Sequence, residues 1–158
     1  MISWPCKLYE VMVLFPANAS RPEKDFALAE SACALLEDNV ELHAFENTPN
    51  AETPYWYNAA DVVVLPSFYE GSANAVKEAM ACNRPLVTTD MGDCRERIEG
   101  VAGCYVANSY NVAEFTELLM RALEYIKKTR GRERLMKDEI SASQIARKLT
   151  DIYENVNK

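Results

Sequence analysis

The chain has 158 residues, the size of one domain, and 49% of them are hydrophobic, which is enough to form a folded core. Its 17 basic and 24 acidic residues give a net charge of −7, so it lacks the overall positive field of a general nucleic-acid-binding protein. No apolar run approaches the roughly 20 residues that cross a bilayer, and we expect a cytoplasmic protein.

Strand-like and helical segments alternate along the chain. The patterns predict strands at Val11–Phe15, Val40–Phe45, Asp61–Leu65, Pro85–Thr89 and Gly103–Val106. Helical signals lie from about Pro22, at Pro54–Ala60, from Glu70–Asn74 to about Asn83, and at Asn111–Lys127, where Asn111 and Glu114 have capping-box spacing. A charged hinge at Lys127–Arg134 leads to a last helix with Ile145, Leu149, Ile152 and Val156 at near-heptad spacing.

This alternation predicts one domain over residues 1–158, a doubly wound, Rossmann-like parallel sheet of about five strands with helices on both faces. We expect the C-terminal helices, about 128–158, to pack on it. Ligands of such sheets bind at the carboxyl ends of the strands. The loops of interest are therefore Pro16–Lys24, Phe45–Asn47, Pro66–Asn74 and Thr89–Glu96.

The numbers and spacing of histidine and cysteine argue against two kinds of site. The five cysteines contain no Cys-x-x-Cys pair, and with His43 as the single histidine we expect no zinc site and no histidine-based nucleophilic catalysis. We interpret His43 as a structural residue with a satisfied hydrogen bond. The cysteines, which we expect to be reduced and mostly packed, are Cys6, Cys33, Cys82, Cys94 and Cys104.

The segment from Pro66 to Glu78 carries the strongest signal for a ligand. A buried strand runs into a turn of small residues and then a helix, so free backbone N–H groups at Ser72–Asn74 and the positive end of the helix dipole would face an anion. Gly71, which has no side chain, would allow a ligand to approach the backbone closely. Every strand–helix junction of this fold shares some of this character.

Two carboxylates flank this turn. Glu70 lies in the loop before the helix, and Glu78 lies on the same helix face as Asn74. Because the rest of that helix is largely apolar, a carboxylate there needs hydrogen-bond donors, and sugar or ribose hydroxyls are suitable. The alternatives are a solvated loop acid for Glu70 and, for Glu78, an ion pair with Lys24 or Arg97.

Local cations must offset the acidic chain if a diphosphate binds. Lys24 and Arg21 are the best placed, because they follow the first strand at its carboxyl end. The alternative for each is a solvated base in the first helical turn. Lys77 immediately precedes Glu78, so we expect its side chain to point elsewhere.

Several segments match the motifs of one enzyme family, in order. They are Pro22–Lys24, similar to a segment with a phosphate-binding lysine; Asp61–Ser72, similar to "aDv…lPS..EG"; Glu70 and Glu78, spaced as in E-x7-E; Glu78–Val87, similar to "EAMa.g.PvV"; and Gly92, Glu96 and Gly103, similar to "GG..E…G". The stretch from about Val11 to Leu123 thus resembles the C-terminal, donor-binding domain of a GT-B glycosyltransferase of family 4, the group 1 transferases.

The resemblance implies roles for these residues. Lys24 and the backbone at Ser72–Asn74 would bind the diphosphate of a nucleotide-sugar such as a UDP- or GDP-sugar, Glu70 would face the donor sugar, Glu78 would hold the ribose, and the nucleobase would lie near Phe45–Asn47. It further implies a retaining, hexosyltransferase-type reaction of polysaccharide biosynthesis that needs no metal. The implied catalytic residues are Glu70 and Lys24, and the implied donor-binding residues are Arg21, Gly71, Ser72, Ala73, Asn74 and Glu78.

Three features depart from the family pattern. The family's arginine commonly lies further upstream of the lysine than Arg21 does. Only Val40–Ala60 stands where the family has another strand and helix, so we expect a smaller sheet. The N-terminal acceptor-binding domain of the family is absent from this sequence. We therefore expect the isolated chain to be inactive without that domain or a partner chain. We expect any attachment to a membrane surface to occur through the absent domain.

Other functions remain as alternatives. A non-catalytic nucleotide-sugar-binding or interaction module on the same fold, for which a homodimer is one form, competes with the transferase. A dinucleotide-dependent oxidoreductase is disfavoured because no G-x-G-x-x-G follows the first strand. A phospho-receiver domain is disfavoured because Pro16–Asn18 offers no acidic pair at the end of that strand.

Overall fold

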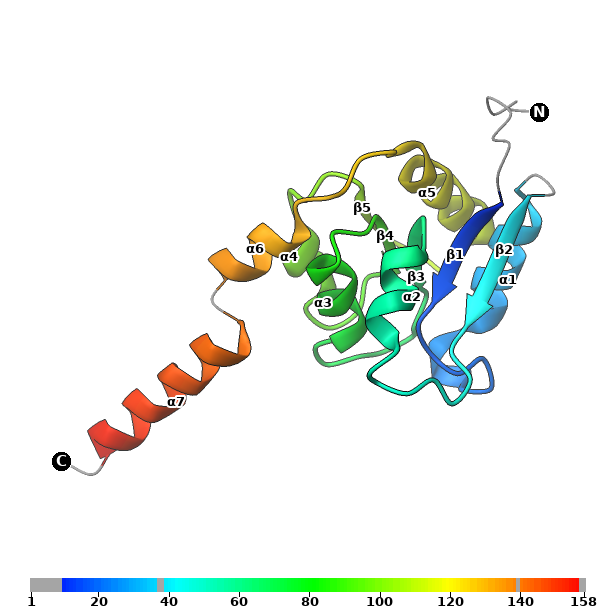
Figure 1. Ribbon diagram of the computed structural model, residues 1–158. Coiled ribbons are helices and arrows are strands. Elements are labelled where there is room, and N and C mark those ends of the chain that lie inside the picture. The colour runs from blue at the N-terminus through cyan, green and yellow to red at the C-terminus, as the bar shows by residue number, and fades with distance from the viewer. Residues whose placement is uncertain (1–9, 37–38, 139, 157–158) are drawn as a thin grey trace.

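The computed structural model describes residues 10–36, 39–138 and 140–156, so Cys6 lies outside the described residues. Within these ranges five parallel strands form one sheet with helices on both faces (Figure 1). The predicted doubly wound, Rossmann-like α/β fold of about five strands is therefore confirmed.

The order of the strands locates the edge where a ligand would bind. The strands are β1 (Val11–Phe15), β2 (Val40–Ala44), β3 (Val62–Leu65), β4 (Leu86–Thr89) and β5 (Cys104–Ala107), and their order in the sheet is β2-β1-β3-β4-β5. The chain passes from β1 to the edge strand β2 and then crosses to the other side of β1 for β3. The direction of winding reverses between β1 and β3, and ligands of such sheets bind outside the carboxyl ends of the strands at that point.

Two hydrophobic clusters lie on opposite faces of the sheet. On one face, α1 (Phe26–Ala34) and α5 (Val112–Glu124) pack on the strands around Phe15 and Phe115. On the other, α2 (Thr53–Ala59), α3 (Asn74–Ala81) and α4 (Cys94–Ile98) pack around Leu14 and Met80. All four residues of β3 (VVVL) and of β4 (LVTT) are buried, because helices cover both faces of the sheet. The hydroxyls of Thr88 and Thr89 in β4 donate to the carbonyls of Leu65 and Ser67.

Three helix ends differ from the predicted ones. Pro22–Lys24 form a separate 3-10 turn, η1, after which Asp25 adopts a φ of 50° and accepts a hydrogen bond from the Leu28 amide at the start of α1. Helix α3 begins at Asn74, because Gly71 and Ser72 are poor helix formers that remain in the loop. Helix α5 ends at Glu124 instead of Lys127, and the ring of Tyr125 then packs on Gly103.

Only one of the two hydrogen-bonded contacts of the predicted capping box forms at the start of α5. The Asn111 side chain accepts hydrogen bonds from the amides of Ala113 (2.9 Å) and Glu114 (3.2 Å), which confirms it as the N-cap. The Glu114 carboxylate does not reach back to Asn111. It accepts instead from the Asn108 amide at 2.8 Å and the Ser109 hydroxyl at 2.5 Å, because the turn at Asn108 and Ser109, just before the helix, lies within reach of the Glu114 side chain.

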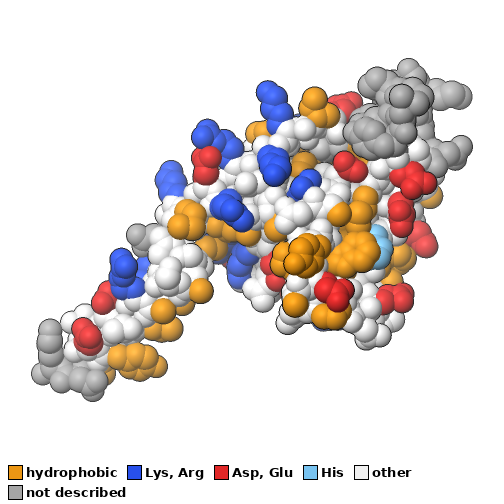
Figure 2. All heavy atoms as spheres, in the orientation of Figure 1, with side chains coloured by type: hydrophobic (Ala, Val, Ile, Leu, Met, Phe, Trp, Pro, Cys, Tyr) orange, Lys and Arg blue, Asp and Glu red, His pale blue; other side chains and the backbone are white. Residues whose placement is uncertain are grey.

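The two C-terminal helices differ in their packing. Helix α6 (Gly131–Lys137) begins inside the predicted hinge and lies on α3, where a Cβ on Gly131 would stand 2.7 Å from the Cα of Met80. Helix α7 (Ala142–Val156) extends away from the sheet and has no buried residue, in contrast to the packed helix we expected. Its heptad-spaced residues Ile145, Leu149, Ile152 and Val156 are exposed, and Figure 2 shows hydrophobic side chains along one side of it.

Candidate functional site

Two predicted loops meet at the reversal point of the sheet. The first follows β1 and contains η1, and the second follows β3 and leads into α3. The amide of Phe68 in the second loop donates a hydrogen bond to the carbonyl of Glu23 in the first, at 3.0 Å. This backbone contact brings together residues that lie more than 40 positions apart in the sequence.

Lys24 and Glu70 form an ion pair across these loops. Their side chains are 13% and 22% exposed, so both charges lie in partly desolvated surroundings. Desolvation and the nearby Arg21 lower the pKa of Lys24, while Glu23 acts to raise it. Both residues were predicted to lie in the site, but their contact with each other was not predicted. Glu70 is paired with Lys24, in contrast to the alternative of a solvated loop acid.

Arg21 lies beside this pair but is engaged locally. Its Nε donates to Glu23 Oε1 at 2.7 Å, and its side chain is 56% exposed. The guanidinium thus stands at the rim of the site with a carboxylate partner of its own.

The first turn of α3 presents backbone N–H groups to this edge. Ala73 is the N-cap residue, and no side chain of the described residues caps the helix. A Cβ on Gly71 would meet no described atom within 4 Å, so the loop is open at that point. Because α3 starts at Asn74, the N–H groups of its first turn begin there, and Ser72 and Ala73 of the predicted Ser72–Asn74 segment precede the helix.

Lys77 adds a cation that was not predicted to lie here. Its ammonium group lies 3.4 Å from the Ser72 carbonyl oxygen and 3.3 Å from Asn74 Oδ1. The long side chain bends back along α3 to the N-terminal turn, in the direction that helical side chains favour. Lys77 points away from Glu78, as predicted, but toward the candidate anion site.

Glu78 is exposed, so the expected cost of burying its carboxylate does not arise. Its partner is neither Lys24 nor Arg97 but Tyr57 of α2, whose hydroxyl donates to Glu78 Oε2 at 2.8 Å. Tyr57 is 1% exposed, and burial together with the Glu78 charge raises its pKa. A rigid, neutral donor therefore orients one oxygen of Glu78. The signal for Tyr57 in the sequence was the aromatic composition of residues 54–60.

Aromatic rings line the neighbouring edge at the carboxyl end of β2. Phe45 packs edge-on against Tyr57 with ring centroids 6.1 Å apart. The ring of His43 stacks on Trp56 at 3.9 Å, an aromatic contact that differs from the hydrogen bond we expected for this histidine. The predicted nucleobase loop, 45–47, thus begins beside the residue that orients Glu78.

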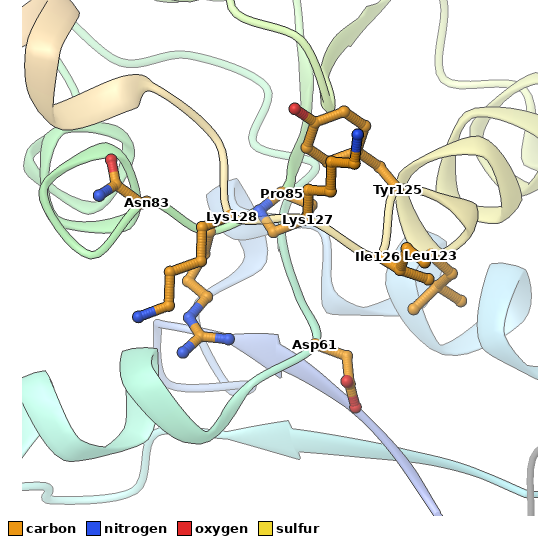
Figure 3. A pocket seen from close by; sticks show the side chains of 9 residues that line it. Asp61, Asn83, Pro85, Leu123, Tyr125, Ile126, Lys127 and Lys128 are labelled. Carbon is orange, nitrogen blue, oxygen red and sulfur yellow. The ribbon is translucent and has the colours of Figure 1, made fainter.

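A separate pocket lies at the amino-terminal ends of β3 and β4. It has a volume of about 110 Å³ and is lined by residues that precede β3 and β4 and by residues at and after the end of α5 (Figure 3). Its lining residues are Asp61, Asn83, Arg84, Pro85, Leu123, Tyr125, Ile126, Lys127 and Lys128. Asp61, part of the family-like motif, has a structural contact there, since its Oδ2 accepts from the Met12 amide at 2.9 Å.

In the described ranges, no three His, Cys, Asp or Glu residues are grouped so that they could hold a metal ion. None of the helices described is long and apolar enough to cross a membrane.

Comparisons with known proteins agree with the motifs. Residues 18–125 match the sequence profile of the family described as "Glycosyl transferases group 1". The chain is 36% identical over 98 residues to a D-inositol 3-phosphate glycosyltransferase of Arthrobacter sp., covering 61% of this chain and 23% of that protein. It is 37% identical over 115 residues to the protein of that name from Frankia alni, covering 72% and 28%.

A similar fold occurs in sucrose-phosphate synthase from Thermosynechococcus elongatus, with a TM-score of 0.78 at 19% sequence identity. The matched region covers 93% of this chain and 45% of that one. The chain thus spans about a quarter of the length of the two curated relatives and under half of the structural neighbour. The profile match across most of its length shows that this chain belongs to the group 1 glycosyltransferase family.

Proposed function

We propose that this chain is the donor-binding domain of a retaining, hexosyltransferase-type glycosyltransferase. The observation that carries the proposal is the Lys24–Glu70 ion pair beside the uncapped N-terminus of α3, at the reversal point of the sheet. A cation, a carboxylate and free amides at one edge suit a ligand that carries both phosphates and hydroxyls.

The diphosphate of a nucleotide-sugar would bind at the N-terminus of α3. Lys24 would leave Glu70 and pair with the phosphates, and Arg21 would lie at the rim of the site. Backbone N–H groups would donate to the phosphates from Gly71, Ser72, Ala73 and Asn74. Lys77 would add positive charge from the helix side. These groups would stabilise the charge of the leaving diphosphate, so the proposed reaction needs no metal ion.

The two carboxylates would hold the sugars of the donor. Once Lys24 turns to the phosphates, Glu70 can accept hydrogen bonds from hydroxyls of the transferred sugar. Glu78 would hold the ribose hydroxyls with the oxygen that Tyr57 does not occupy. The nucleobase would lie near Phe45–Asn47, next to the Phe45–Tyr57 contact.

The acceptor would bind to a part of the enzyme outside this chain. The relatives are about four times as long as the region that they share with it. We therefore expect the isolated chain to bind the donor weakly and to transfer little sugar by itself.

Isothermal titration calorimetry with UDP, GDP and ADP tests this proposal. We expect one of them to bind and Lys24→Ala and Glu78→Ala each to weaken binding at least about tenfold, because each removes a charged or hydrogen-bonded contact. Lys128→Ala, in the pocket at the amino-terminal ends of β3 and β4, is the matched control and should bind normally. No binding of any nucleotide at millimolar concentration would refute the proposal and favour the non-catalytic interaction module.

A further inference from the structure

The loop after β4 supports the donor loop, by which we mean residues 70–74. Gly92 has a φ of 51°, and a Cβ on it would stand 2.2 Å from the carbonyl oxygen of Gly71. The next residue, Asp93, accepts a hydrogen bond at 2.8 Å from the hydroxyl of Ser72. The donor loop therefore rests on Gly92 through its backbone and on Asp93 through a side chain.

Asp93 is in turn held by Arg97 of α4. Arg97 Nη2 lies 2.5 Å from Asp93 Oδ2, and the two side chains are 19% and 26% exposed. Partial burial acts to raise the pKa of Asp93, but hydrogen bonds from Arg97 and Ser72 outweigh it and lower the pKa overall. Arg97 thus keeps Asp93 ionised and offsets a negative charge that lies close to the proposed phosphate site.

Arg97 also connects to α6. Its Nη1 lies 3.7 Å from Asp138, the C-cap residue of α6. The Asp138 carboxylate accepts at 3.0 and 3.1 Å from Arg134, whose guanidinium donates to the carbonyls of Glu99 (2.7 Å) and Glu96 (2.9 Å). These contacts join α6, α4 and the donor loop in one continuous network of charged and hydrogen-bonded groups.

The sequence of this loop differs from the motif it resembles. In "GG..E…G" the residue after Gly92 is a second glycine, whereas this chain has Asp93. A glycine has no side chain with which to hold Ser72 or bind Arg97, so the network depends on the side chain found here.

We propose that Asp93 is a positioning residue for the donor loop and that Arg97 links the position of α6 to it. The proposal rests on the proposed function only where it predicts nucleotide affinity, because the geometry of the loop can be measured without ligand.

Nuclear magnetic resonance of the ligand-free chain tests the link directly. Asp138→Asn weakens the α6 end of the network, so we expect shifts of the Gly71 and Ser72 amide signals and about threefold to tenfold faster exchange of amides in the first turns of α3. Glu133→Gln is the matched control, because Glu133 lies on α6 and forms an exposed ion pair with Arg130, the N-cap residue of that helix. If Asp138→Asn leaves the donor loop as unchanged as Glu133→Gln does, the link to α6 is wrong.

Asp93→Asn and Ser72→Ala test the positioning role, and Ser72→Ala removes only the hydroxyl, so it keeps the test valid if Asp93→Asn fails to fold. We expect each to change the same amides, and Asp93→Asn combined with Asp138→Asn to add little to Asp93→Asn alone. Full additivity, or an unchanged loop in both single variants, would overturn the proposal.

Nucleotide titrations then separate the two proposals. We expect Asp93→Asn to weaken the nucleotide that binds the wild-type chain about threefold to tenfold, while Glu133→Gln does not. If the wild-type chain binds none of UDP, GDP and ADP and the loop still responds to Asp138→Asn, the proposed function fails and the structural link stands. Unchanged affinity in a chain that does bind would contradict the positioning role of Asp93.

Discussion

Replacing Gly92 by alanine should displace the donor loop of the candidate site and also destabilise the fold. The new methyl group would stand 2.2 Å from the Gly71 oxygen and 2.5 Å from the Glu70 oxygen, both backbone atoms of the donor loop. That loop must move by about 1 Å to restore ordinary contact. A residue with a Cβ at a φ of 51° also bears about 1–2 kcal/mol of backbone strain, partly offset by about 0.4–1 kcal/mol from the less flexible unfolded chain.

Gly100→Ala separates the cost of the clash from the cost of the backbone strain. Gly100 has a φ of 74°, and a Cβ on it would meet no described atom within 4 Å, so this variant bears the backbone strain without the clash. In urea unfolding we expect Gly100→Ala to lose about 1 kcal/mol or less and Gly92→Ala about 2–4 kcal/mol.

The clash should also appear in ligand binding. We expect Gly92→Ala, at a temperature where it stays folded, to bind nucleotide at least about tenfold more weakly than Gly100→Ala, because the donor loop is displaced. Equal stability of the two variants would refute the close approach of the two loops.

Three further predictions concern single side chains. Tyr57→Phe keeps the packed ring but removes the hydrogen bond to Glu78, so we expect a loss of about 1 kcal/mol in unfolding free energy and weaker nucleotide binding, whereas an unchanged affinity would contradict the proposed role of Tyr57. Hydrogen bonds from Ser109 and Asn108 lower the pKa of Glu114, so its contribution to stability should be present near neutral pH and be lost as the pH falls below about 4.3; Glu114→Gln should remove this part of the acid dependence in pH-dependent unfolding. Burial raises the pKa of Cys33 and Cys104 to about 12 and of Cys94 to about 11, so at pH 8 iodoacetamide should alkylate them slowly until the chain unfolds, which mass spectrometry of digested protein can measure.

Local patterns were sufficient for the sheet and for most of its helices. The run VVVL predicts a strand because its residues are all apolar and mostly β-branched, and the structure buries every one of them. The N-cap role of Asn111 could be predicted because a cap depends on the next three residues alone. The packing of α7 was not predictable in this way, since an apolar stripe indicates that a face can be buried and not that something covers it.

Contacts of side chains across the fold lay beyond the sequence patterns. Lys24 was predicted to bind phosphate and Glu70 to bind sugar hydroxyls, but their pairing depends on how η1 and the loop after β3 are placed by the backbone bond from Phe68 to Glu23. The partner of Glu78 was misjudged for the same reason, because Tyr57 lies on another helix whose position is set by packing.

The sequence by itself determined the fold class, the family and the loops in which the candidate site lies, because apolar periodicity, turn residues and short motifs act over a few neighbouring positions. Only the tertiary structure decided that Lys24 meets Glu70, that Tyr57 orients Glu78 and that Asp93 joins the donor loop to Arg97 and α6. These contacts join residues far apart in the chain, and they exist because parallel strands bring the loops at their carboxyl ends to one edge of the sheet.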